Sequence, residues 1–228
     1  MRGLRFVGRL GAADAVTVGN AALGFVAVAL AGQPRLAARI VLLAAILDAV
    51  DGILARRYGG TDAGPYLDSL ADVSSFCVAP AALVVAVARE AFGTPTVLAV
   101  AVGALYVASG VARLGLYTAY DSDATETEGV QTTLAATVLS AAVLAGLVSP
   151  LALVSLTAVL AVSMLTRFTY PDLHPQDASV MGLVQTAAIV GRGWVGRGFA
   201  FALLVLALSY FLFAPRLYWS CAAGSCGG

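Results

Sequence analysis

The sequence predicts an all-α protein, a polytopic bundle of helices integral to a membrane. Apolar residues make up 60% of the 228 residues and charged residues only 11%, and the mean hydropathy is +0.91. Long apolar runs recur along nearly the whole chain, each close to the ~20 residues that a spanning helix needs. The formal net charge is zero, so no overall field favours nucleic acid as a partner.

Eight apolar stretches follow one another, and we expect one helix at each. Gly and Pro, which interrupt helices, mark most of the breaks between them. The first six are expected to span the membrane, and the last two add one or two spans, because the seventh is short. In chain order the stretches are residues 15–31, 36–55, 66–88, 96–117, 130–148, 151–165, 178–190 and 198–214.

We take residues 1–215 as one transmembrane domain and residues 216–228, which are rich in Gly, as a flexible tail. The tail holds Cys221 and Cys226, but these two cysteines and the single His of the chain do not make the usual ligand set of a zinc site. Cys77 falls inside an apolar stretch and is expected to pack in the interior.

The placement of Arg predicts the orientation in the membrane, because cytoplasmic loops carry an excess of positive charge. With eight spans and a cytoplasmic N-terminus, eight Arg lie on the cytoplasmic side and five on the other. This orientation places residues 48–72 at the cytoplasmic face. Residues 121–128, which carry four acids, lie on the same side and are expected to form a solvated connector.

Acidic side chains are concentrated in residues 48–72, at helical spacing. Residues spaced by three, four or seven positions share one face of a helix. The first such stripe holds Asp48, Asp51, Gly52 and Ala55. The second holds Gly64, Asp68 and Asp72. The sequence Tyr58-Gly-Gly60 between them suits a tight reversal, so we expect two antiparallel helices whose acids face each other near the membrane surface.

Four carboxylates that face one another need a compensating cation, because like charges repel. Hard divalent ions with oxygen ligands meet this need, and Mg²⁺ commonly takes carboxylates together with substrate phosphates. Two such ions would suit the clamping of a diphosphate. Gly52 and Ala55 leave a slot for a flat ligand such as a nucleobase or ribose. Arg56 can bind a phosphate oxygen through its planar fork.

Two other readings of the acids remain open at this point. Intramembrane acids can form a cation or proton path in a transporter, but such paths more often lie near the bilayer midplane on discontinuous helices. The acids could also only cap or solvate helix ends, which suits a single Asp better than four at these spacings. Their position beside a polar turn favours chemistry at the membrane surface.

The segment resembles the signature of the CDP-alcohol phosphotransferases, Asp-x2-Asp-Gly-x2-Ala-Arg followed by Gly-x3-Asp-x3-Asp. Every fixed position is filled. Seven residues separate Arg56 from Gly64, fewer than is usual in this family, and the shortening falls in the predicted turn. The resemblance covers about residues 12–170. It implies the six-helix core of the family, with one or two extra C-terminal spans.

Within the family, the chain resembles the phosphatidylserine synthases and, among these, the archaeal archaetidylserine synthases. Residues 67–81, Leu-Asp-Ser-Leu-Ala-Asp-Val-Ser-Ser-Phe-Cys-Val-Ala-Pro-Ala, are similar to their version of the second half-signature. Residues 17–24 are similar to their Thr-x2-Asn-x3-Gly. Residues 109–117 keep Arg113 of a stretch with two Arg, and Leu116 replaces the second. Residues 131–136 and 181–185 resemble the corresponding segments of archaeal members of this group.

The resemblance implies transfer of a phosphatidyl-type group from CDP-archaeol or CDP-diacylglycerol to the hydroxyl of L-serine, with release of CMP. Glycerol 3-phosphate or inositol phosphate remain alternative acceptors. Two ions, Mg²⁺ or Mn²⁺, would be held by Asp48, Asp51, Asp68 and Asp72. Asp72 would also act as the catalytic base.

The remaining site residues fall into two groups. The CDP-lipid, through its CMP part, would be bound by Gly52, Ala55, Arg56, Gly64, Thr17 and Asn20. The serine carboxylate needs a cation, for which the candidates are Arg113 and Arg167. In the alternative, Arg113 has no role in binding, and its long side chain only carries the guanidinium from the end of the fourth span to the membrane surface.

Small residues are frequent throughout, with 24 Gly in the chain. They let transmembrane helices approach closely and associate, so a homodimer is expected. The expected partners are therefore CDP-lipid, serine, membrane lipids and a second copy of the chain, and no nucleic acid. The expected location is the cell membrane, with the active site at its cytoplasmic face.

Overall fold

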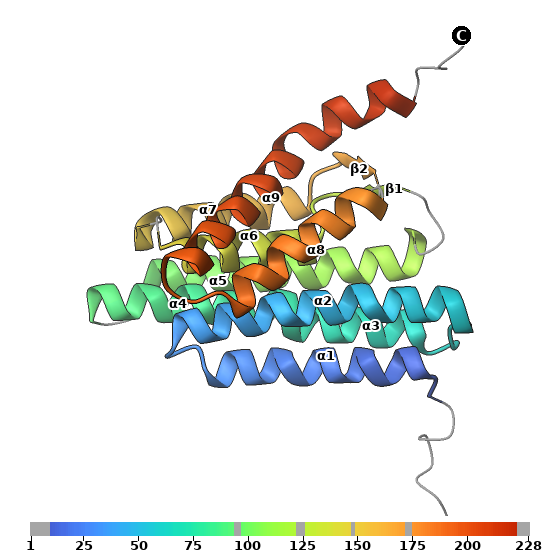
Figure 1. Cartoon of the computed structure of the whole chain (residues 1–228), viewed down its shortest axis with the longest axis horizontal. Helices are drawn as coiled ribbons and strands as arrows, with labels where there is room; N and C mark the ends of the chain where they lie inside the picture. The colour runs from blue at the N-terminus through green and yellow to red at the C-terminus, as the bar shows by residue number, and fades with distance from the viewer. Residues whose placement is uncertain (1–9, 94–96, 122–125, 147–148, 172–174, 223–228) are drawn as a thin grey trace, which may run out of the picture.

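A computed structural model describes residues 10–93, 97–121, 126–146, 149–171 and 175–222. These residues form a helical bundle in which most axes run along the long dimension, while the last helix lies obliquely across it (Figure 1). The predicted all-α class is confirmed.

Each predicted apolar stretch corresponds to a helix. The first two are α1 (Ala12–Ala29) and α2 (Pro34–Tyr58), and the third consists of α3 (Gly64–Asp72), a π-helical segment (Val73–Val78) and α4 (Ala79–Phe92) in one continuous run. Next come α5 (Val97–Leu116), which a π-helical turn extends to Asp121, then α6 (Thr132–Ala145) and α7 (Pro150–Met164). The last two are α8 (Pro175–Val190) and α9 (Gly193–Ala222).

Four of these helical runs are long and apolar enough to cross a membrane: residues 12–29, 64–92, 97–120 and 193–214. Helices α6 and α7 and residues 178–190 are apolar but shorter. Helix α2 is long, but it carries Arg at both ends and the two Asp of the first stripe. The chain is an integral membrane protein.

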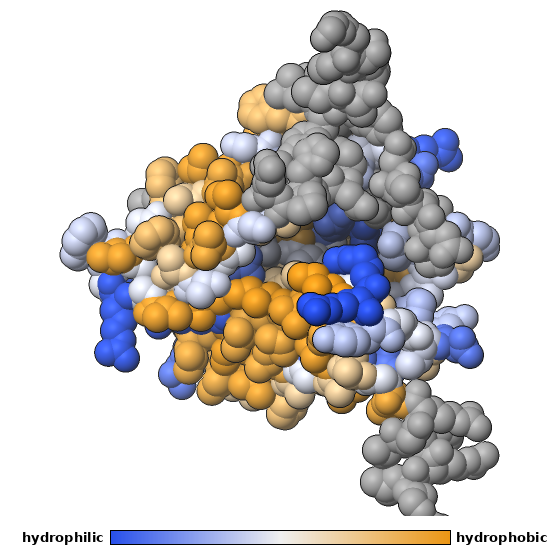
Figure 2. Space-filling model, turned by 45° about the vertical axis from the view of Figure 1, so that its right-hand side comes forward, coloured by the Kyte–Doolittle hydropathy of each residue, from blue (hydrophilic) through white to orange (hydrophobic). Residues whose placement is uncertain are grey.

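The surface supports this assignment. Figure 2 shows a broad hydrophobic area across the middle of one face, with most of the strongly hydrophilic residues toward its margins. Large apolar side chains are widely exposed, among them Phe25 at 70%, Val97 at 86% and Val162 at 60%. Soluble monomers rarely expose such continuous apolar surface, so lipid is the expected solvent for these side chains.

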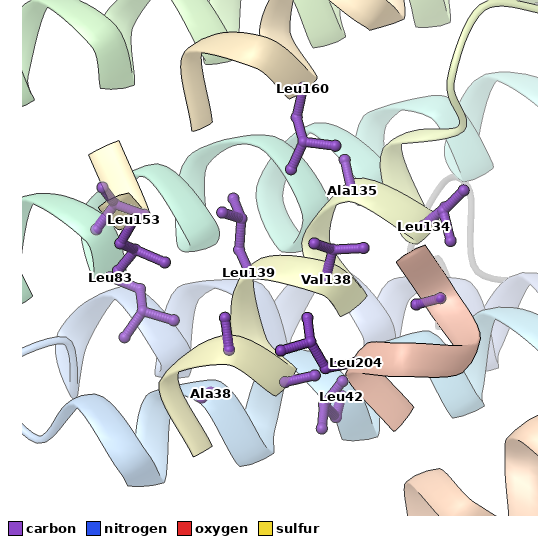
Figure 3. Packing of buried hydrophobic residues seen from close by; sticks show 14 of the residues in the cluster. Ala38, Leu42, Leu83, Leu134, Ala135, Val138, Leu139, Leu153, Leu160 and Leu204 are labelled. Carbon is purple, nitrogen blue, oxygen red and sulfur yellow. The ribbon is translucent and has the colours of Figure 1, made fainter. Parts of the chain in front are cut away.

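The core surrounds α6, of whose fourteen residues twelve are buried. A helix that is apolar on all sides lies in the interior, and α6 packs against α2, α4, α7 and α9. In Figure 3, Val138 and Leu139 of α6 lie among Leu42 of α2, Leu83 of α4 and Leu204 of α9. This central position brings the first residues of α6 to the end of the bundle where the acids lie.

Helix α1 approaches the π-helical segment closely. A Cβ on Gly24 would lie 2.7 Å from the carbonyl carbon of Ser74, so only Gly fits there. Ser74 and Ser75 donate hydrogen bonds to main-chain oxygens of α1, and Tyr106 donates one of 3.0 Å to the Phe76 oxygen. These bonds satisfy groups around the π-helical turn, which directly follows Asp72 and fixes its position.

Two departures from the sequence prediction concern connections. Residues 121–128 were expected to be a solvated connector; residues 122–125 lie outside the described residues, whereas Glu126–Glu128 form the strand β1, which pairs antiparallel with β2 (Thr169–Pro171). A partner some forty residues away leaves no local pattern to detect. Helix α9 continues to Ala222, past residue 215, where we expected a tail; Pro215 lies inside the helix, as membrane helices tolerate.

One end of the bundle collects the polar connections. The start of α1, the turn from α2 to α3, the end of α5 and the β1–β2 pair all lie toward the right in Figure 1. Arg2, Arg5 and Arg9, which contribute to the orientation argument, lie outside the described residues. The grouping nevertheless places residues 48–72 at the same end as the start of α1.

Candidate metal, nucleotide and acceptor site

Three carboxylates from two helices meet at this end. Asp48 of α2 and Asp68 and Asp72 of α3 each offer an oxygen, and these oxygens lie within 4.8 Å of one another. Helix α3 packs mainly against α1. The carboxylates of α2 and α3 nevertheless come together between these two helices.

Asp51 is held separately from this group. It is 5% exposed and accepts a hydrogen bond of 2.6 Å from the Thr17 hydroxyl of α1. Thr17 Oγ1 also lies 3.1 Å from the Ala13 oxygen. Thr17 therefore orients the fourth acid, and α1 contributes directly to the site.

The first turn of α6 faces Asp72 and Asp48. Thr132 donates to Asp72 Oδ2 at 3.4 Å and Thr133 to Asp48 Oδ2 at 3.5 Å. These bonds are long, and they leave the carboxylates poorly compensated. Sequence analysis did not predict either Thr as part of the site, since both stand in an apolar stretch without a motif of known chemistry.

The residues fit a divalent metal ion. Asp72 is 7% exposed, and its buried Oδ1 has no hydrogen-bond partner among the described residues. The side chains of Asp48 and Asp72 lie within hydrogen-bonding reach of each other, an arrangement that needs a proton or a cation between them. Carboxylate oxygens are the ligands that Mg²⁺ and similar hard ions prefer.

A cavity of about 410 Å³ adjoins Asp51 and Asp68. Five of the six residues predicted to bind the CMP part line it: Thr17, Gly52, Ala55, Arg56 and Gly64. A Cβ on Gly52 would lie 3.6 Å from Arg56 Nη1, so the guanidinium of Arg56 folds back over the Gly52 position. The structure thus brings the small residues and the phosphate-binding cation to one cavity.

Asn20, the sixth predicted residue, does not line this cavity. It lies one turn further along α1 than Thr17 and is fully buried. Its side-chain amide has no hydrogen-bond partner among the described residues.

Sequence analysis missed Asp14 and Thr61, which also line the cavity. Asp14 is 2% exposed and accepts hydrogen bonds from the Gly11 N–H at 2.7 Å and the Thr61 hydroxyl at 2.9 Å. The pair ties the start of α1 to the turn between α2 and α3. An acid three residues after the N-cap is a known helix-start signal, and this signal was available in the sequence.

A second cavity, of about 230 Å³, holds both residues predicted to bind serine, Arg113 and Arg167. Arg113 is 8% exposed, and its buried Nε has no hydrogen-bond partner among the described residues. The charges of Arg113 and Asp72 interact. Tyr117 lines both this cavity and the larger one, so one side chain separates them.

A third cavity is an apolar groove of about 590 Å³ between α2, α6, α8 and α9. Thr133, which donates to Asp48, forms part of its wall. Ile46, Val50, Leu134 and Leu183 are among the apolar side chains that line it. The first cavity is thus lined by two of the carboxylates, whereas the second is linked to Asp72 through Arg113 and the third to Asp48 through Thr133.

Comparison with protein families agrees with this geometry. Residues 10–168 match the model of the CDP-alcohol phosphatidyltransferases. The chain belongs to the CDP-alcohol phosphatidyltransferase family. Enzymes of this family act on a CDP-lipid and an alcohol within the membrane. They use divalent metal ions, for which the carboxylates described above provide ligands.

A curated member of the family is similar over most of its length. The archaetidylserine synthase of Methanothermobacter thermautotrophicus is 32% identical over 171 residues, which are 73% of this chain and 72% of the relative.

Proposed function

We propose that this phosphatidyltransferase transfers the phosphatidyl-type group of a CDP-lipid to the hydroxyl of L-serine, releasing CMP and forming an archaetidylserine or phosphatidylserine. The observation that carries the proposal is that two cavities flank the carboxylates. The cavity of about 410 Å³ is lined by Asp51 and Asp68, and the arginine-lined cavity contains Arg113, whose charge interacts with that of Asp72 in the three-carboxylate group. Similarity to an archaetidylserine synthase supports serine as the acceptor.

Asp48, Asp51, Asp68 and Asp72 would hold two divalent ions, Mg²⁺ or Mn²⁺. Bound there, the ions would neutralise charge on the diphosphate and on the departing CMP. The CMP part would occupy the cavity beside Asp51, where Gly52 and Ala55 present little side chain and Arg56 reaches a phosphate oxygen. Gly64 and Thr17 complete this cavity, and Asn20 supports it from one turn deeper.

Asp72 is proposed as the base. It ends the second stripe, it is nearly buried, and one oxygen is free of hydrogen bonds from described residues. It accepts the proton of the serine hydroxyl while the hydroxyl oxygen attacks the lipid-side phosphorus. The bond between that phosphorus and the CMP oxygen breaks, and CMP leaves with the electron pair. A serine hydroxyl is a weak acid, so correct placement supplies much of the rate.

The serine carboxylate would be bound by Arg113 and Arg167 in the second cavity, where the charge of Arg113 interacts with that of Asp72. A planar guanidinium binds a carboxylate through two parallel hydrogen bonds. The hydrocarbon chains of the CDP-lipid would lie in the apolar groove beside Thr133, which is near enough to Asp48 for the chains and the diphosphate to belong to one molecule.

We further propose that the enzyme lies in the cell membrane with this site at the cytoplasmic face, as the Arg distribution predicts. Small residues on exposed helix faces support a homodimer. Crosslinking in native membranes tests the dimer, and accessibility of a single Cys introduced at Asp62, an exposed position in the turn between α2 and α3, tests the orientation.

The test of the proposed function is an acceptor panel. Purified enzyme is supplied with Mg²⁺ or Mn²⁺, with CDP-archaeol or CDP-diacylglycerol, and with L-serine, glycerol 3-phosphate or inositol phosphate. We expect CMP and a serine-headed lipid. A product with another head group would overturn the acceptor but leave the reaction class intact, whereas ion flux without CMP release would favour a transporter.

A further inference from the structure

Opposite charges face the second cavity without pairing. Besides Arg113 and Arg167, its lining includes Glu128, the last residue of β1. Within the described residues, Glu128 forms no ion pair with either Arg. Arg113 lies at the buried end of the cavity, whereas Glu128 and Arg167 are exposed. The space between them therefore suits a small ligand that itself carries both charges.

Main-chain hydrogen bonds hold Glu128 beside the segment from the end of α7 to β2, which carries Arg167. Glu128 pairs with Thr169 in the strand ladder. Directly after it, the Gly129 N–H donates to the Phe168 oxygen at 2.8 Å and the Val130 N–H to the Ser163 oxygen at 3.2 Å. The segment from the end of α7 to β2 carries Arg167, so the acid and this cation belong to one hydrogen-bonded unit.

Gly129 makes this close approach feasible. Its φ is +74°, a left-handed conformation that favours Gly. A Cβ at this position would lie 2.3 Å from the Met164 oxygen, a distance too short for any residue other than Gly. Residue 129 thus lets the main chain turn against the end of α7 and brings Glu128 to the cavity wall.

We infer that Glu128 binds the ammonium group of the acceptor and so selects an amino acid over other hydroxy acids. The inference rests on the proposed function, since it concerns the same acceptor. Serine has a carboxylate for Arg113 and Arg167, an ammonium for Glu128, and a hydroxyl that must reach Asp72, whose charge interacts with that of Arg113. Both charges of the zwitterion are then compensated inside the cavity.

The test compares L-serine with 3-hydroxypropionate, which has the hydroxyl and the carboxylate but no ammonium. In the wild type we expect kcat/KM for serine to exceed that for 3-hydroxypropionate by about 100-fold, because a site built for a charged hydrogen bond rejects the analogue that lacks it. In Glu128→Gln we expect KM for serine to rise about tenfold or more, while 3-hydroxypropionate is used no worse than before.

Glu90→Gln is the matched control, because Glu90 is an exposed acid in α4 at the opposite end of the bundle; it should leave both acceptors unchanged. Glu128→Asp, which keeps the charge, should recover part of the preference. Thermal unfolding in detergent identifies variants that fail to fold. The comparison of the two acceptors in the wild type tests the inference even if a variant does not fold.

The outcomes separate the two proposals. If the wild type does not use serine, the proposed function fails. If it uses serine but accepts 3-hydroxypropionate within a few-fold, or if folded Glu128→Gln lowers kcat/KM for both acceptors equally, the role of Glu128 is overturned while the proposed function stands.

Discussion

Replacing Thr17 with Val tests whether α1 orients the fourth acid. The substitution keeps the shape of the side chain and removes the hydroxyl that donates to Asp51 at 2.6 Å. Both groups are buried, so no water readily takes the place of this donor. Asp51 is then free to turn away from the position in which it would bind an ion.

The size of the effect follows from the type of bond. A hydrogen bond to a charged group contributes about 1.5–3 kcal/mol, which corresponds to roughly a 10- to 150-fold change in an equilibrium constant. Loss of groups that orient metal ligands typically lowers metal affinity by about 10- to 100-fold. We therefore expect the Mn²⁺ concentration for half-maximal CMP release to rise by at least about tenfold.

The assay titrates Mn²⁺ at saturating CDP-lipid and serine, and it follows the Mn²⁺-dependent rise in melting temperature as a second readout that needs no turnover. Thr157→Val is the matched control, because Thr157 is also a buried Thr but donates to the Leu153 oxygen within α7. It should lower stability slightly without changing the Mn²⁺ titration. A folded Thr17→Val enzyme whose titration matches the wild type would refute the role of Thr17.

Two further predictions concern the strand pair and the metal. Gly129→Ala should raise KM for serine and lower the melting temperature, because its Cβ would meet the Met164 oxygen. Gly146→Ala is the control: Gly146 has a similar φ, +67°, and no neighbour within 4 Å, so this variant should lose only about 1–2 kcal/mol of stability and keep the wild-type KM. Equal KM values for the two variants would contradict this prediction. Removal of divalent ions by a chelator should abolish CMP release. Mn²⁺ at 100 times its dissociation constant should stabilise the wild type by about 2.7 kcal/mol and should stabilise Asp48→Asn less. Full activity in the presence of the chelator would contradict the metal site.

Much of this architecture was predictable because the information is local. Apolar stretches near membrane length locate the helices, and the spacing of the acids determines which face of α2 and α3 carries them. The small residues Gly52 and Ala55 predicted the cavity that they line. Such patterns repeat every turn of a helix, so a single sequence is enough to detect them.

Apart from Asp14, whose helix-start signal is local, the features that were missed depend on contacts between distant segments. Thr132 and Thr133 look like ordinary residues of an apolar helix until α6 is placed beside the acids. Glu128 stands in a polar loop by its sequence, and only pairing with β2 brings it to Arg167. No local period reports such a pairing, since it depends on where α6 and α7 return the chain.

The central claim is that the Asp cluster transfers a phosphatidyl-type group and that Asp72 removes the proton of the acceptor. The most direct test measures CMP release and serine-headed lipid for the wild type and Asp72→Asn, with CDP-lipid binding and thermal unfolding as checks on the fold. General base catalysis contributes about 10²- to 10⁴-fold, so the variant should bind CDP-lipid and lose activity by at least about 100-fold. A folded Asp72→Asn enzyme that releases CMP near the wild-type rate would contradict the account.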